Sequence, residues 1–110
     1  MRCFIKTEKF TEDTLNLTKE ERRDFLLQHK AWIENLKSKK IKASSGYLVN
    51  KDNEPGGGGL LIIYSNSYEE AMKIVREDPM IKNNLVTWEL NEWIALNKTS
   101  LSDFIEDNLS

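Results

Sequence analysis

The sequence predicts an α+β domain with a ferredoxin-like βαββαβ fold, in which two helices pack on one face of a four-stranded antiparallel sheet. Three observations predict it: four segments have strand patterns, two have amphipathic helix patterns, and their order is strand, helix, strand, strand, helix, strand. A chain of 110 residues is long enough for a single core. We expect one domain at residues 1–94 and a short C-terminal helical extension at residues 95–110.

The first helix is expected at residues 18–40. Thr18 and Glu21 have the spacing of a capping box, and lysines near the other end suit the negative end of the helix dipole. Apolar residues recur every three or four positions and share one stripe. They are Phe25, Leu26, Trp32, Ile33 and Leu36. His29, the only histidine of the chain, falls within this stripe, so we expect its ring to point towards the interior.

Four strands are expected where β-forming residues alternate with polar ones or run together between turn formers. They are expected at residues 2–7, 41–49, 60–64 and 85–93. The segment 60–64 is apolar at every position, so both of its faces should be buried. Gly46 interrupts the second strand, which indicates a bulge or the close approach of another backbone.

The remaining segments are expected to be two connections and a second helix. Residues 8–17 read as a polar connection, and residues 50–59, which end in four glycines, as a loop between strands. Neither a helix nor Gly-Lys-Ser/Thr follows the glycines, so a hairpin loop is favoured and a phosphate-binding loop is disfavoured. The hairpin loop could fold over a pocket. Residues 67–70 predict a second capping box, and the Asp-Pro pair at 78–79 should end this helix.

Composition and charge argue against several partners and cofactors. The net charge of −2 provides no basic field for nucleic acid, and the strand at 60–64 lacks the stacking aromatics of RNA-binding ferredoxin-like domains. No apolar run is long enough to span a membrane and no signal peptide is evident, so a cytoplasmic location is expected. One cysteine, Cys3, and one histidine make no recognisable metal or disulfide framework, and we expect neither metal nor cofactor.

Two helices can cover only one face of a four-stranded sheet. The strand at 60–64 is apolar on both faces, and we expect Phe4 to add to the uncovered side. An exposed apolar patch of this size is typical of an interface. We therefore expect a symmetric homodimer that forms through the open sheet face.

Two titratable residues are candidates for chemistry. His29 could be a core histidine with its nitrogens satisfied, or a general acid or base, since histidine is the side chain that ordinarily exchanges its proton near neutrality. Asp78 could simply help to end a helix before Pro79. Because both helices lie on the same face of this fold, the carboxylate could also reach and orient the imidazole. The residues alone leave these alternatives open.

Three further residues are candidates for the lining of a pocket. Ser45 and Gly46 could line a pocket in which Ser44 and Ser45 donate hydrogen bonds to a ligand, although a serine near a bulge commonly bonds its own backbone. Trp88 could face a ligand, although a tryptophan at this position in a strand is usually a core residue. A lysine cluster at residues 37–42 could attract an anion, but a solvated helix end explains it as well.

Taken in order, several motifs resemble the YciI-like (YCII-related) family of the dimeric α/β barrel superfamily. They are His29, Ala43-Ser-Ser-Gly46, Gly56-Gly-Gly-Gly59, Ser67-Tyr-Glu-Glu-Ala71 and Asp78-Pro79. The resemblance implies a dimer of ferredoxin-like subunits and a His–Asp pair in a pocket, carried here by His29 and Asp78. It also implies chemistry without a cofactor, because one branch dehydrochlorinates chlorinated hydroxyhydroquinones and the superfamily includes muconolactone isomerases and cofactor-free monooxygenases.

Two classes of function follow from these observations. The first is a cofactor-free lyase or isomerase, in which His29 moves a proton on a small cyclic substrate and Asp78 orients the ring. The second is a dimer without chemistry that binds a small ligand or has a structural role. A pocket around His29 would favour the first class, and a filled core around it would favour the second.

Overall fold

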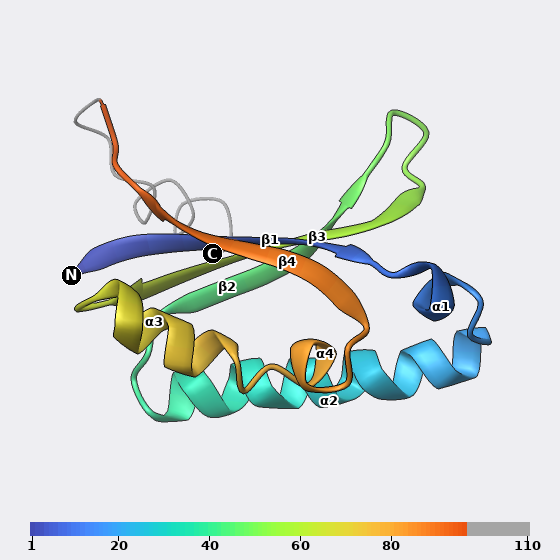
Figure 1. Cartoon of the computed structure of the whole chain (residues 1–110), viewed down its shortest axis with the longest axis horizontal. Helices are drawn as coiled ribbons and strands as arrows, with labels where there is room; N and C mark the ends of the chain where they lie inside the picture. Colours follow the sequence, from blue (N-terminus) through green and yellow to red (C-terminus); the bar gives the residue numbers. More distant parts are fainter. Residues whose placement is uncertain (97–110) are drawn as a thin grey trace.

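The structure is a computed structural model that describes residues 1–96, and it contains a four-stranded antiparallel sheet with helices on one side (Figure 1). The strand order is β2-β3-β1-β4. The elements are β1 (Arg2–Phe10), α1 (Glu12–Leu15), α2 (Lys19–Ser38), β2 (Ala43–Val49), β3 (Pro55–Ser65), α3 (Tyr68–Val75), α4 (Pro79–Lys82) and β4 (Val86–Trp93). The predicted ferredoxin-like fold is confirmed. Beyond residue 96, the predicted C-terminal extension lies outside the residues that the structure describes.

Helix α2 begins where the capping box predicts. Thr18 Oγ1 accepts from the Glu21 N–H at 3.1 Å, and Glu21 Oε1 accepts from the Thr18 N–H at 3.1 Å. The apolar stripe is narrower than the sequence predicts, since Leu36 is buried but Leu26 is 47% exposed. The helix therefore turns one side to the sheet and leaves the His29 ring, 15% exposed, accessible to solvent.

Strand β1 is longer than predicted, and the glycine segment is part of a strand rather than a loop. Glu8 and Lys9 pair with Gly59 and Gly58 of β3, so neither residues 8–10 nor the glycines form the expected connections. The physical reason is crowding between neighbouring strands, which leaves no room for a side chain at Gly59. A Cβ at Gly59 would lie 3.1 Å from the Gly46 carbonyl oxygen and 3.3 Å from Cγ of Glu8. The crowded position is thus Gly59. A Cβ at Gly46 would meet no atom within 4 Å, so the close approach expected there is not found.

The irregularity of this edge of the sheet lies further along the strand than the sequence suggests. The pairing of β2 with β3 shifts register between Tyr47 and Val49, not at Gly46. Within the glycine segment, Gly57 has a φ of 74°, a left-handed conformation that favours glycine. Gly57 has no partner in either ladder, so the glycines allow an irregular step between Pro55, which pairs with β2, and Gly58, which pairs with β1.

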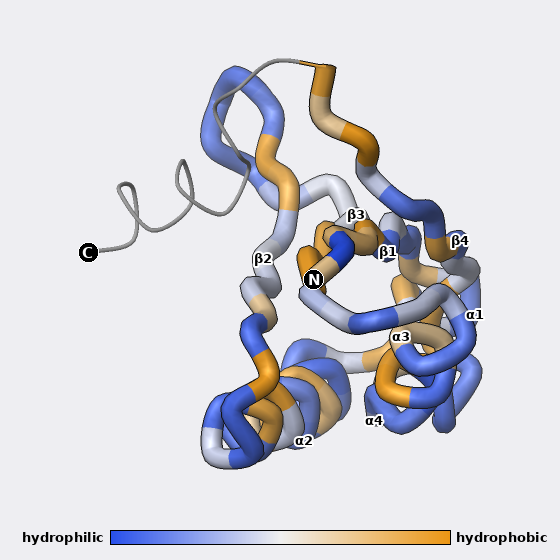
Figure 2. The backbone as a smooth tube through the Cα atoms, turned by 90° about the vertical axis from the view of Figure 1, so that its left-hand side faces the viewer, coloured by the Kyte–Doolittle hydropathy of each residue, from blue (hydrophilic) through white to orange (hydrophobic). Residues whose placement is uncertain are grey.

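Phe4 faces the helices, which corrects the expectation that it lies on the uncovered side. It pairs with Ile63 across the sheet and is completely buried. The main core cluster, between sheet and helix layer, is Phe4, Leu61, Ile63, Ala71, Val75 and Leu90. Because side chains alternate along a strand, Ile5 points to the other face, opposite Ile62 and Asn91. Figure 2 shows the layers from the side, with α2, α3 and α4 below the sheet.

Candidate active site

Asp78 begins a helix rather than ending one. Helix α3 stops at Val75, and Asp78 caps the following short helix α4. Its Oδ1 accepts from the Met80 N–H at 3.0 Å, while Pro79 occupies the first position of the helix, where no N–H is needed. The side chain of Asp78 is completely buried. A buried carboxylate is costly unless charged or hydrogen-bonding groups surround it, so its neighbours define the site.

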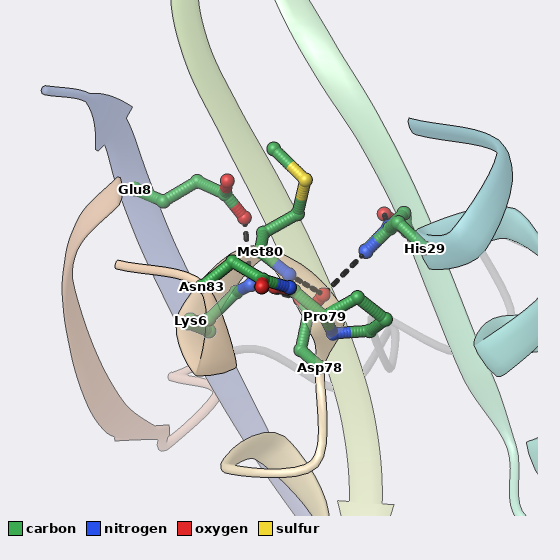
Figure 3. Close-up of polar contacts among 8 residues, drawn as sticks. Lys6, Glu8, His29, Asp78, Pro79, Met80 and Asn83 are labelled. Atoms are coloured by element: carbon green, nitrogen blue, oxygen red, sulfur yellow. Dashed lines mark hydrogen bonds and ion pairs between the residues drawn. The ribbon is translucent and has the colours of Figure 1, made fainter. Parts of the chain in front are cut away.

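His29 of α2 is one of these neighbours. Its Nδ1 lies 2.9 Å from Asp78 Oδ1, a contact between residues 49 positions apart in the chain (Figure 3). The Trp32 ring, one turn further along α2, lies 5.7 Å from the imidazole between ring centroids. An ionised Asp78 accepts only, so the Nδ1 nitrogen of a neutral ring carries the hydrogen and Nε2 is left as an acceptor.

Lys6 is the second neighbour, and the sequence analysis missed it. Its Nζ lies 2.8 Å from Asp78 Oδ2 and 2.6 Å from Glu8 Oε1, and its side chain is completely buried (Figure 3). The signal that could have found it is the alternation of β1. Phe4, Lys6 and Glu8 share one face of the strand, so placing Phe4 in the core also places a lysine there.

The surroundings of Asp78 keep it ionised. Burial by itself raises the pKa of this carboxyl group, but the hydrogen bond from His29 and the charge and hydrogen bond of Lys6 outweigh it, so the pKa of Asp78 lies below its usual value. The two oxygens have different roles, since Oδ2 bonds Lys6 and Oδ1 bonds Met80 and His29. The result is a fixed, negatively charged support for one nitrogen of the imidazole.

Ser45 completes the row of polar groups. Its Oγ lies 2.7 Å from His29 Nε2. Ser45 is on the edge strand β2, where it is exposed. The structure therefore brings together three of the predicted residues, His29, Asp78 and Ser45, from three separate elements of the chain.

The other predicted pocket residues have different positions. Gly46 follows Ser45 on β2 and has open space where a side chain would stand, with no atom within 4 Å of that point. Trp88 packs against both core clusters, as the expectation that it is a core residue predicts. Cys3 is half-buried, and burial raises the pKa of its thiol despite the opposing hydrogen bond with Tyr64, so a reactive thiolate is disfavoured.

A groove of about 700 Å³ lies between α2 and α3, beside the His–Asp pair rather than around it. Its apolar lining is Trp32, Leu36, Ile41 and Ile74, and its polar lining is Asn35, Lys39, Lys73, Arg76, Glu77 and Lys82. Trp32, which contacts the His29 ring, connects the two sites. Within residues 1–96, no group of three or more His, Cys, Asp or Glu side chains is placed to hold a metal ion.

These features define the class: a ferredoxin-like domain with a buried aspartate that supports a partly exposed histidine. The chain belongs to the family of YCII-related domains, whose model matches residues 3–94. The family resemblance expected from the sequence is thus confirmed. No helix of the part of the chain that the structure describes is long and apolar enough to cross a membrane.

The solved structures similar to this chain include an enzyme. The 5-chloro-2-hydroxyhydroquinone dehydrochlorinase of Burkholderia phenoliruptrix AC1100, solved in complex with 2,5-dihydroxybenzoquinone, is 26% identical, with a TM-score of 0.64 over 84% of this chain and 93% of that one. The de novo designed protein Ferredog-Diesel is 16% identical, with a TM-score of 0.50 over 83% of this chain and 84% of that one, and shows the fold alone. No curated protein matches the sequence.

Proposed function

We propose that this protein is a cofactor-free acid/base enzyme of the lyase or isomerase type, which moves a proton on a small cyclic substrate. The observation that carries the proposal is the contact of 2.9 Å between His29 Nδ1 and Asp78 Oδ1, in which a buried, ionised carboxylate holds a partly exposed ring. In this role His29 accepts or donates the proton at Nε2. Asp78 is a positioning residue that fixes the ring and stabilises its protonated form.

The neighbour among solved structures supports an elimination in particular. That protein is a dehydrochlorinase of a chlorinated hydroxyhydroquinone. Loss of HCl from such a ring starts when one hydroxyl proton moves to the carbon that carries chlorine, which gives a keto tautomer. A second hydroxyl then loses its proton as chloride leaves and the quinone forms. Both proton transfers can use one group that donates and accepts a proton, and they need neither metal nor redox cofactor. A single histidine supported by a carboxylate supplies that group. We therefore place halogenated polyhydroxylated rings first among candidate substrates.

The test compares His29→Gln with the exposed neighbouring variant Gln28→Ala on 5-chloro-2-hydroxyhydroquinone, with chloride release and quinone absorbance as readouts. We expect wild type and Gln28→Ala to release chloride at similar rates. We expect His29→Gln to lower kcat/KM by roughly 10²–10⁴-fold, the usual contribution of a positioned acid or base. Equal rates for His29→Gln and wild type would refute the assignment of His29.

The structure also offers two observations in favour of a non-catalytic role. The groove lies beside the His–Asp pair rather than around it, so it is not the pocket around His29 that the enzyme class predicts. Both ring nitrogens of His29 have partners within the chain, Asp78 and Ser45, as expected for a satisfied structural histidine. The alternative is therefore a dimer that binds a small ligand or is purely structural. It predicts no turnover of any tested ring by wild type, and a His29→Leu variant at least as stable as wild type in urea unfolding.

A homodimer through the open sheet face is part of this proposal. Ile5, Leu60 and Tyr64 lie half-buried on the face opposite the helices, and Ile62 between them is 8% exposed. When a second copy of the chain covers this row with its own, apolar surface is removed from water in both copies. We also propose a cytoplasmic location.

The dimer is tested with Ile5→Asp, which puts a charge in the middle of this face. We expect wild type at micromolar concentration to have twice the chain mass in light scattering, and Ile5→Asp to have the mass of one chain, because an unpaired charge at an interface is strongly unfavourable. Thr7→Asp, nearer the end of the same row, is a milder control. A wild-type mass of a single chain would overturn the proposed dimer.

A further inference from the structure

Three side chains from three segments form one continuous row of hydrogen bonds that the proposed proton transfer does not fully use. Ser45 Oγ lies 2.7 Å from His29 Nε2, and His29 Nδ1 lies 2.9 Å from Asp78 Oδ1. A hydroxyl, an imidazole and a buried carboxylate in this order are the parts of a nucleophilic serine site. Proton transfer to and from a ring requires His29 and Asp78 but not the hydroxyl of Ser45.

The donors and acceptors of this row are arranged so that the Ser45 hydroxyl donates to the imidazole. Lys6 and the Met80 N–H hold Asp78 as an acceptor, so the Nδ1 of a neutral His29 ring donates to it. Nε2 is then the acceptor, and the Ser45 hydroxyl donates to it at 2.7 Å. The serine proton is therefore already directed at the base that would remove it.

Ser45 is also accessible to an incoming group. It is exposed on β2, the edge strand of the sheet. The Tyr64 N–H donates to the Lys42 carbonyl at 3.0 Å, so hydrogen-bonded pairs fall on even-numbered residues of β2 in this register. The alternation of an antiparallel ladder turns the Ser45 N–H to the free edge, where it can donate to an oxyanion formed at its own side chain.

We infer that Ser45 is a nucleophile and that the site has a second activity, the hydrolysis of small, activated carboxylic esters. Ser45 Oγ attacks the carbonyl carbon while its proton passes to His29 Nε2. The bond from carbon to the leaving alcohol or phenol oxygen breaks, and that oxygen takes the proton from His29. Water then attacks the acyl-serine, His29 removes its proton, and the carboxylic acid leaves as the Ser45 hydroxyl is restored. The reaction involves no oxidation or reduction, and water is the only co-reactant.

The test is labelling of the full chain with a fluorophosphonate, followed by mass spectrometry of peptides, together with turnover of p-nitrophenyl acetate. We expect one adduct per chain, on Ser45, and an initial burst of p-nitrophenolate. Ser45→Ala should lose both. Ser44→Ala is the matched control, because Ser44 is the adjacent residue and alternates to the opposite face of β2. It should label like wild type. His29→Gln should slow labelling by roughly 10²-fold or more.

Each other outcome overturns the inference. Labelling of Ser45→Ala at the wild-type rate, an adduct or acetyl group on His29 or a lysine instead of Ser45, or no adduct on a folded wild-type chain would do so. The Nε2 and Nδ1 nitrogen shifts of the single histidine establish that Ser45→Ala keeps the His29–Asp78 contact. Chloride release from the hydroxyhydroquinone and ester hydrolysis, both measured on wild type, separate the two proposals. If wild type releases chloride but does not hydrolyse the ester, only the nucleophilic role of Ser45 is refuted. If it hydrolyses the ester but releases no chloride, only the proposed elimination on the hydroxyhydroquinone is refuted.

Discussion

Replacement of Lys6 with methionine is expected to lower the free energy of unfolding by about 3–5 kcal/mol, the usual cost of removing one partner of a buried ion pair. Methionine fills a similar volume, so the loss is mainly electrostatic. The change leaves the buried carboxylate of Asp78 without its nearest cation and Glu8 without its partner. Urea unfolding at neutral pH measures it. Glu8→Gln is the matched control and should cost much less, because Lys6 and Asp78 still neutralise one another.

The effect of Lys6→Met should also depend on pH. The folded-state pKa of Asp78 lies below its usual value, so this group contributes stability at neutral pH that is lost as the pH falls through the lowered pKa. Without Lys6, protonation of Asp78 relieves an unpaired buried charge instead. The difference in unfolding free energy between wild type and Lys6→Met should therefore narrow from about pH 7 to about pH 3. A constant difference would contradict the role assigned to this ion pair.

Replacement of Phe4 with alanine is expected to cost about 3–5 kcal/mol, as large-to-small changes of buried aromatic residues do. Phe4 is completely buried in the main cluster, and its ring meets Tyr68 edge-on with centroids 6.1 Å apart. Alanine would leave a cavity between the sheet and α3. The measurement is again urea unfolding, and a loss below about 1 kcal/mol would contradict the placement of Phe4 in the core.

Ile5→Ala is the control for Phe4→Ala, because the two residues are adjacent in β1 and face opposite sides of the sheet. The cost of Phe4→Ala should not change with protein concentration, since its cavity lies within one chain. The cost of Ile5→Ala should depend on concentration if the open face pairs with a second copy. Together the two variants separate the core of the subunit from the proposed interface.

Local chemistry in the sequence predicted the elements well. The reciprocal bonds of Thr18 and Glu21 mark the start of α2, and the alternation of Val86 and Leu90 with exposed residues marks β4. The His–Asp pair was expected from the family resemblance, and the structure brings both residues into contact. Their use in catalysis remains a prediction. The spacing of the chain could not establish the contact, because His29 and Asp78 are 49 positions apart.

The failures of sequence reasoning concern choices that depend on distant partners. Alternation puts Phe4 and Lys6 on one face of β1, but it does not say which face the helices cover. The four glycines have the composition of a loop, yet pairing with Glu8 and Lys9 makes them part of β3. Turn propensity is a weak preference, and the pairing of Gly58 and Gly59 with the neighbouring strands outweighed it here.

The sequence by itself determined the order of the four strands and two main helices, and that one histidine lies along the inner side of a helix. These are outcomes of short-range periodicity and capping, whose partners are three or four residues away. The sequence did not determine the full lengths of β1 and β3 or the short helices α1 and α4. Only the tertiary structure decided that Lys6, Asp78, His29 and Ser45 meet in one polar row. The physical reason is that a buried charge needs partners from other elements, and strand register and helix packing select those partners.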